Sequence, residues 1–211
     1  MCFIVFWQLV GRYKNMSIRL NDRDGKRTNE EARENIDSNT AREAMMKPVV
    51  LELLRTKYPN AEIEDSGIDN SGKFIPDSDV DIEKLKHPDW LVHLGHKSFY
   101  VEAMVHSEVF WICSFKETKL RNAIEHNAQI WVLRDRYVDI YPTETCRFLL
   151  ENYDIITLRK KMGSNLGVEL NKYDVDSLIG VNKIRRVKWP EKCVEMLKFR
   201  YDKRSGFSVQ R

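Results

Sequence analysis

The sequence has few of the features that mark fibrous, disordered, secreted or membrane proteins. Of its 211 residues only 9 are glycine and 6 are proline, whereas 42% are hydrophobic and 32% are charged. This composition excludes collagen-like, low-complexity and wholly disordered classes. The four cysteines lie far apart, with no C-x-x-C pair and no dense disulfide pattern. We therefore expect a reduced, intracellular protein.

Long apolar runs are also scarce, and the longest is residues 1–10. This run is too short for a transmembrane helix, and its positive charges follow it instead of preceding it as in a signal peptide. We expect no membrane association. The run is interpreted as a strand or as a patch that packs against the body or a second subunit, and a chain start at Met16 is a further alternative.

The length predicts one compact module with extensions and not two equal domains. The turn-rich stretch 21–29 indicates a linker, so we divide the chain into an extension at 1–29, a core at 30–150 and a C-terminal extension at 151–211. Charge is uneven: residues 1–29 carry +4, residues 181–211 carry +7, and the middle carries −8. An acidic centre between basic ends suits a protein that gathers cations and holds a polyanion. Ordinary solvated tails would have the same charge.

Hydrophobic periodicity and turn residues predict alternating helices and strands. Residues 30–58 have the spacing of a long helix. Further strands are expected at 61–66, 129–133 and 137–141, and further helices at 116–127, 174–179 and 190–201. This order predicts an α/β protein with a mixed sheet flanked by helices.

The most informative segment, residues 88–105, reads as two strands around a type II′ turn at Gly95 and His96. A two-residue turn makes the numbers of paired residues sum to 191. Asp89 then lies opposite Glu102, with side chains that begin about 4.5 to 5.5 Å apart. The other face of the hairpin is apolar and is expected to be buried; it carries Trp90, Val92, Phe99 and Val101.

Two facing carboxylates raise each other's pKa unless a cation lies between them. Oxygen ligands of this kind select Mg²⁺ or Mn²⁺. A solvated acidic pair at a sheet edge is the alternative interpretation. A second Pro-Asp pair offers Asp77 as a rival to Asp89, although its spacing to Glu102 does not form a simple hairpin.

Three segments resemble the PD-(D/E)XK nuclease superfamily: PDW at 88–90, YVEAM at 100–104 and FWICSFKE at 110–117. The resemblance covers about residues 41–141 and implies a restriction-endonuclease-like core. It further implies metal-dependent hydrolysis of DNA, with Mg²⁺ or Mn²⁺ held by Asp89, Glu102 and the carbonyl of Ala103. The small size is similar to that of Holliday junction resolvases and viral nucleases, which implies a homodimer acting on duplex or branched DNA.

One position departs from the superfamily pattern, because Met104 stands where the motif has lysine. Members of the superfamily can move this lysine to a neighbouring element, and Lys116 is the first candidate and Lys119 the second. His87, which the predicted pairing places opposite Met104, is a third proton donor. If none of them reaches the site, the chain is a catalytically impaired DNA-binding or assembly protein.

Two further features complete the prediction. The resemblance implies an additional acidic residue from the first helix, for which we assign Glu43. Residues 183–189 mix cations with apolar residues and are expected to lie along a DNA backbone or to form a strand that pairs subunits. The candidate DNA-binding residues of this run are Lys183, Arg185, Arg186 and Lys188. The acidic centre also suits a small phosphorylated substrate.

Overall fold

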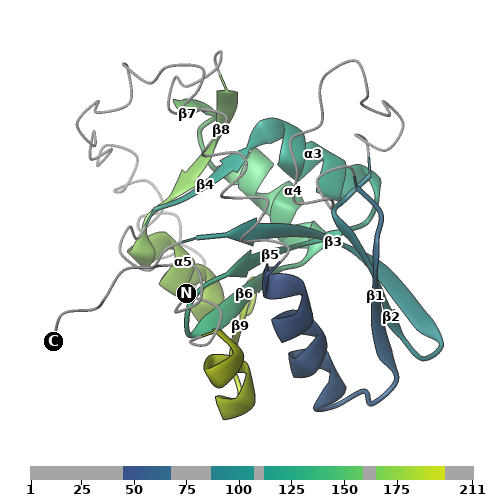
Figure 1. Ribbon diagram of the computed structural model, residues 1–211. Coiled ribbons are helices and arrows are strands. Elements are labelled where there is room, and N and C mark those ends of the chain that lie inside the picture. The colour runs from purple at the N-terminus through teal and green to yellow at the C-terminus, as the bar shows by residue number, and fades with distance from the viewer. Residues whose placement is uncertain (1–44, 68–86, 107–111, 159–164, 198–211) are drawn as a thin grey trace, which may run out of the picture.

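A six-stranded mixed sheet lies at the centre of the molecule (Figure 1). The computed structural model describes residues 45–67, 87–106, 112–158 and 165–197. The strand order is β1-β2-β3-β5-β6-β9, and every neighbouring pair is antiparallel except β3 and β5, which are parallel. The predicted α/β class with a mixed sheet is therefore confirmed.

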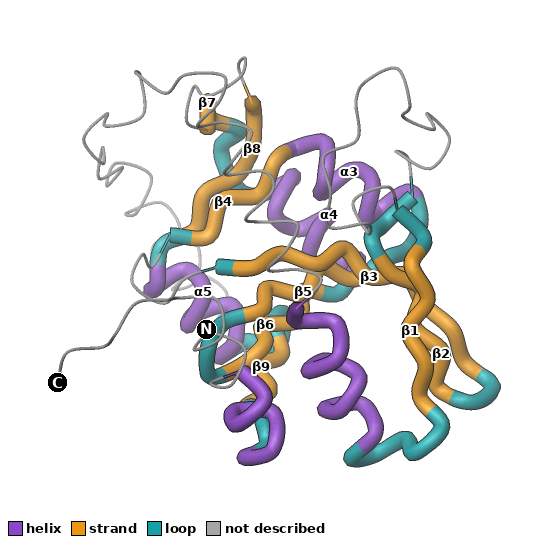
Figure 2. The backbone as a smooth tube through the Cα atoms, viewed as in Figure 1, coloured by secondary structure: helices purple, strands orange, loops and turns teal. Residues whose placement is uncertain are grey.

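Figure 2 distinguishes the helices from the strands by colour. The strands of the central sheet are β1 (Ala61–Asp65), β2 (Trp90–Leu94), β3 (Lys97–Val105), β5 (Gln129–Leu133), β6 (Tyr137–Tyr141) and β9 (Arg185–Lys188). A smaller antiparallel sheet has the order β4-β8-β7 and consists of β4 (Cys113–Lys116), β8 (Asn165–Leu170) and β7 (Ile156–Leu158). The helices are α3 (Glu117–Glu125), α4 (Thr143–Asn152) and α5 (Lys172–Gly180), together with helical residues 45–55 and 191–197.

Apolar side chains cover both faces of the central sheet and form two cores. On one face Val92 and Trp131 pack with helical residues 45–55 and 191–197. On the other face Ile130 and Tyr141 pack with α3, α4, α5 and the smaller sheet. Because a buried large apolar side chain contributes about 1.5 to 3 kcal/mol, these two cores fix the sheet between its helices.

The basic C-terminal run belongs to this fold. Strand β9 pairs with β6 of the same chain, and the indole Nε1 of Trp189 donates a hydrogen bond to the carbonyl of Arg134 at 2.7 Å. Cys193 and Leu197 are buried in the core beside helical residues 45–55. Residues 185–188 of this run form a strand, but its observed partner is β6 of the same chain and not a second subunit, and contact with DNA stays a prediction.

Several predicted features lie outside the described residues. They are the apolar run at 1–10, the linker at 21–29, the candidate acidic residue Glu43 and the alternative aspartate Asp77. Among the residues that are described, no helix is long and apolar enough to cross a membrane.

Candidate active site

The β2–β3 hairpin has the predicted register. Trp90 pairs with Val101 and Leu94 pairs with Lys97, so the numbers of paired residues sum to 191. Gly95 has a φ of +67°, a left-handed value that a type II′ turn requires and that glycine adopts without a steric penalty. Asp89 directly precedes β2, and the same register places it opposite Glu102.

Asp89 is held against β3 by its side chain and against β1 by its backbone. Its Oδ2 accepts a hydrogen bond from the backbone N–H of Ala103 at 2.6 Å. Its backbone carbonyl accepts from the N–H groups of Ser66 and Gly67, which follow β1, at 3.0 and 3.3 Å. Only 9% of Asp89 is exposed. These hydrogen bonds therefore fix the Asp89 carboxylate beside the middle of β3, although Asp89 itself precedes the first residue of β2.

Gly67 allows the close approach that this anchoring needs. A Cβ atom at Gly67 would lie 3.2 Å from the Cα of Asp89 and 3.3 Å from the carbonyl oxygens of His87 and Pro88. The neighbouring Ser66 hydroxyl donates to the same Pro88 carbonyl at 2.5 Å. A Cβ at Gly67 would therefore require the adjoining backbone to shift by a few tenths of an ångström.

Glu102 lies in the central part of β3 and is 5% exposed. The Nζ of Lys119, on α3, forms an ion pair with its Oε1. A buried carboxylate needs such a partner because removing a charge from water costs several kcal/mol. The Lys119 side chain is 33% exposed, so the pair reaches the surface. The structure thus brings together Asp89, Glu102 and an ammonium group.

The two candidate lysines differ in position although they are less than one helical turn apart. Lys116 is the last residue of β4 and the N-cap of α3, and its side chain is exposed. It makes no ion pair within the described part of the chain. Lys119, on the first turn of α3, is the one that contacts Glu102. Met104, at the motif's lysine position, packs against the apolar core on the α3 side of the sheet.

His87 packs in a group of aromatic rings with Tyr100 and His126, so it does not lie opposite Met104 as the predicted pairing required. Its ring centroid is 5.1 Å from that of His126 and 6.2 Å from that of Tyr100. The centroids of Tyr100 and His126 are 6.1 Å apart. Sequence reasoning missed the latter two residues. Tyr100 could have been found because it precedes Glu102 by two residues on a strand and so shares its face.

His106 is a further residue that sequence reasoning missed. It follows β3, and strand alternation places it on the same face as Glu102 and Met104. Burial, with Arg134 and then Lys119 as nearby positive charges, lowers its pKa from 6.5 to about 4. The imidazole is therefore neutral at neutral pH, beside the lysine that pairs with Glu102.

The donor set fits a hard divalent cation better than zinc. Among the described residues, no group of three or more His, Cys, Asp or Glu side chains could hold a metal ion. A structural zinc site uses four protein ligands and a catalytic one uses three. Mg²⁺ commonly takes one or two carboxylates and completes its shell with water and substrate phosphate. Asp89 and Glu102 supply two carboxylates, and the backbone N–H of Ala103, the residue after Glu102, donates to Asp89.

Arg186, a candidate DNA-binding residue, is bound within the protein. Its Nε and Nη2 donate to the two carboxylate oxygens of Asp139 at 2.7 and 2.9 Å, and these bonds raise its pKa. Its guanidinium carbon lies 4.1 Å from the ring centroid of Tyr137, and its Nη1 lies 3.6 Å from Asp176. Asp139 is fully buried and also lies 3.6 Å from the Nε of Arg134. This network ties β9 to β6 and occupies Arg186.

The other three candidate DNA-binding residues divide into two kinds. The Nζ of Lys183 lies 4.1 Å from the ring centroid of Phe148 on α4, so this cation packs on the protein. Arg185 and Lys188 are exposed at the two ends of β9, which is an edge strand of the central sheet. These two side chains remain accessible to an external phosphate.

No model of a known protein family matches this chain, and no curated protein matches its sequence. The resemblance to the PD-(D/E)XK superfamily therefore stays a prediction.

Proposed function

We propose that the protein is a metal-dependent nuclease with a restriction-endonuclease-like core that hydrolyses phosphodiester bonds of DNA. The observation that carries the proposal is the facing pair of largely buried carboxylates, Asp89 and Glu102, with Lys119 on Glu102. Two acids and a lysine are the side chains that the superfamily motif combines. Here the lysine comes from α3 and Met104 replaces it on the strand.

Each residue then has a separate role. Asp89, Glu102 and the carbonyl of Ala103 would hold Mg²⁺ or Mn²⁺. Such an ion, when bound, lowers the pKa of a coordinated water and offsets negative charge on the phosphate. Lys119 would orient the attacking water or offset the charge that develops in the transition state. Its long, partly exposed stem allows the ammonium to turn from Glu102 toward a phosphate.

DNA binding would rest on charge and not on base recognition. Arg185 and Lys188 are exposed cations on the edge strand β9. Contacts between such side chains and phosphates are independent of sequence and weaken as salt rises. A homodimer would bring one site to each strand of a duplex.

A nuclease fold that binds DNA without turnover is the competing function. Met104 favours it, because a thioether cannot donate a hydrogen bond or carry a positive charge. The ion pair between Lys119 and Glu102 is also compatible with a purely structural lysine.

Cleavage of supercoiled plasmid and of a synthetic four-way junction separates these functions. The parent and Glu102→Gln are compared with Mg²⁺, Mn²⁺ or EDTA. We expect cutting with either metal, no cutting in EDTA, and loss of cutting in Glu102→Gln. The relative rates on plasmid and junction distinguish a general endonuclease from a resolvase. If neither substrate is cut while DNA binding persists in EDTA, the nuclease proposal is wrong and the binding protein is favoured.

A further inference from the structure

Three aromatic side chains from separate elements meet next to the carboxylates. They are His87 before β2, Tyr100 on β3 and His126 at the end of α3, and we call them the ring cluster. Their centroids are 5.1 to 6.2 Å apart, with interplanar angles of 42° to 71°. These distances are typical of direct aromatic contact.

The ring cluster borders the candidate active site on the side opposite Met104. Tyr100 precedes Glu102 by two residues and therefore shares its face of β3. His87 precedes Asp89 by two residues. His126 is the C-cap of α3, the helix that carries the lysine paired with Glu102. Each element that supplies a charged group to the site thus also supplies a ring.

The cluster lies at the surface and is not closed within the core. His87 is exposed, and Tyr100 and His126 are half-buried. Tyr100 packs against the apolar core that includes the buried side chains of α3, and this packing supports its ring. None of the three side chains has a hydrogen bond to another described residue. A partly exposed ring that packs against the core can present an aromatic face to another flat group.

We propose that the ring cluster stacks against an unpaired nucleobase next to the phosphate that is cut, so that the preferred substrate is DNA with single-stranded nucleotides. Every base has a π face, so aromatic side chains bind single strands with little sequence preference. A base within a duplex is already stacked, and extracting it costs a few kcal/mol. The position of the scissile phosphate rests on the proposed function, whereas the stacking is a binding property with its own readout.

Binding measured in EDTA tests the stacking without cleavage. Fluorescence anisotropy gives the Kd of a labelled single strand and of a blunt duplex of equal length. We expect Tyr100→Leu and His126→Leu each to weaken single-strand binding about tenfold and to leave duplex binding unchanged. Tyr100→Phe, which keeps the ring, should bind as the parent does. Tyr173→Leu is the matched control, because Tyr173 is 74% exposed on α5, away from the cluster.

Folding is checked by circular dichroism, and His87→Ala provides a variant at an exposed position that does not disturb the core. The proposal is overturned if folded Tyr100→Leu, His126→Leu and His87→Ala all keep the parental affinity for the single strand. If the parent cuts DNA but these variants bind normally, the inference fails and the nuclease stands. If the parent does not cut DNA but the variants lose single-strand binding, the ring cluster is a binding site and the nuclease proposal fails alone.

Discussion

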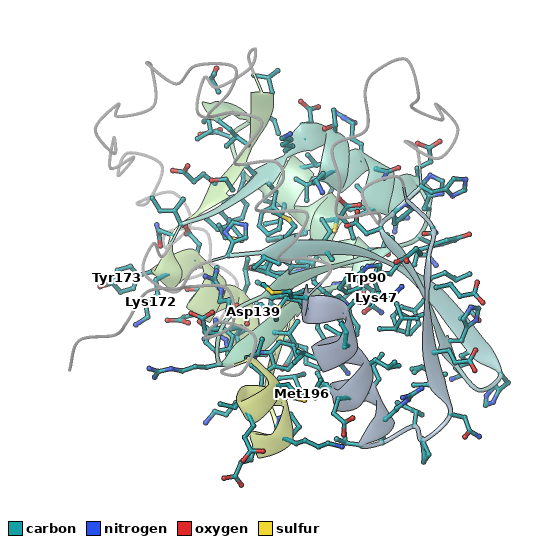
Figure 3. The ribbon with its side chains drawn as sticks, in the orientation of Figure 1. Lys47, Trp90, Asp139, Lys172, Tyr173 and Met196 are labelled. Atoms are coloured by element: carbon teal, nitrogen blue, oxygen red, sulfur yellow. The ribbon has the colours of Figure 1, made fainter. Side chains whose placement is uncertain are left out.

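Two buried carboxylates, Glu102 and Asp139, project from the same face of the central sheet, and their surroundings differ. Asp139 is fully buried, receives two hydrogen bonds from Arg186 and lies 3.6 Å from Arg134. Within the described part of the chain, Glu102 has a single ion-pair partner, Lys119, and that lysine is 33% exposed. Figure 3 labels Asp139 and Trp90, the first residue of β2, and shows the two side chains on different parts of the central sheet.

The difference indicates which carboxylate can bind something further. A bidentate arginine pair uses both oxygens of Asp139 in a fixed geometry, so this site ties β9 to β6. The hairpin register instead places Glu102 opposite Asp89, and its lysine partner is partly exposed. Of the two, only the Glu102 site combines facing carboxylates with access from outside. The following variants test this division of roles.

The largest effect on stability is expected from Asp139→Asn. The substitution leaves the guanidinium of Arg186 without its carboxylate in a partly buried position and removes the opposite charge near buried Arg134. We expect the free energy of unfolding in urea to fall by about 3 to 5 kcal/mol. Asp176→Asn is the control, since its side chain is 48% exposed and its contact with Arg186 should contribute less than about 1 kcal/mol. Equal stability of the two variants would contradict the structural role of Asp139.

The second effect concerns activity and compares the two lysines. Lys119→Met should lower kcat for DNA cleavage by about 10² to 10³, the usual cost of removing a group that stabilises transition-state charge. Lys116→Met should cleave at the parental rate, because Lys116 is exposed on β4 and the ion pair with Glu102 is made by Lys119. Single-turnover kinetics on the preferred DNA measures both. If Lys116→Met is the inactive variant, the lysine has been assigned to the wrong position.

A third effect appears in the pH dependence of stability. The pKa of His106 is about 4 in the folded protein and 6.5 in the unfolded chain, so the unfolded state takes up the proton first as pH falls. The contribution of His106 to the free energy of unfolding is fully present above pH 6.5, its pKa in the unfolded chain. This contribution is lost between pH 6.5 and about 4, by about 2 to 3 kcal/mol in total. The free energy of unfolding, measured with urea at a series of pH values in this range, should fall more steeply with falling pH for the parent than for His106→Gln.

Comparison of the parent with His106→Gln controls for the other groups that titrate in this pH range. Burial raises the pKa of Asp174, which acts in the opposite direction, but this carboxyl is present in both the parent and the variant. Identical pH profiles would show that His106 is protonated in the folded protein as readily as in the unfolded chain.

The smallest effect is expected at Gly67. Gly67→Ala should destabilise the protein by about 1 kcal/mol, because its Cβ would press on the backbone of His87, Pro88 and Asp89. Gly180→Ala is the matched control, since a Cβ at the end of α5 would meet no described atom within 4 Å apart from its chain neighbours and the backbone of its own helix. Thermal unfolding measures both. A destabilised Gly180→Ala with an unchanged Gly67→Ala would mean that Gly67 does not support the position of Asp89.

Local signals in the sequence were enough to predict the hairpin. Its turn carries a glycine at the position with positive φ, and its strands alternate between apolar and polar residues, so one register buries one face. The strands at 129–133 and 137–141 were predicted at their true bounds because each is a short run of mainly apolar, β-branched and aromatic residues between turn residues. Asp89 and Glu102 were thus found opposite each other without any long-range information.

Features that depend on distant contacts could not be predicted. Helix α4 was missed because its buried face carries Thr143, Thr145 and Cys146, which weaken the apolar periodicity. Lys116 was ranked above Lys119, but Lys119 forms the ion pair with Glu102. The direction of α3 relative to β3, which decides this, is set by tertiary packing. Arg186 was assigned to DNA, yet its carboxylate partner lies 47 residues earlier in the sequence.

Binding of Mn²⁺ followed by electron paramagnetic resonance tests the central claim most directly. The parent, Asp89→Asn, Glu102→Gln and Asp176→Asn are titrated with Mn²⁺ in the absence of DNA, after circular dichroism has shown that each is folded. The account predicts that the parent and Asp176→Asn bind the ion equally and that Asp89→Asn and Glu102→Gln lose this binding. Undiminished binding by both hairpin variants would contradict it, because the facing carboxylates would then not be the metal site.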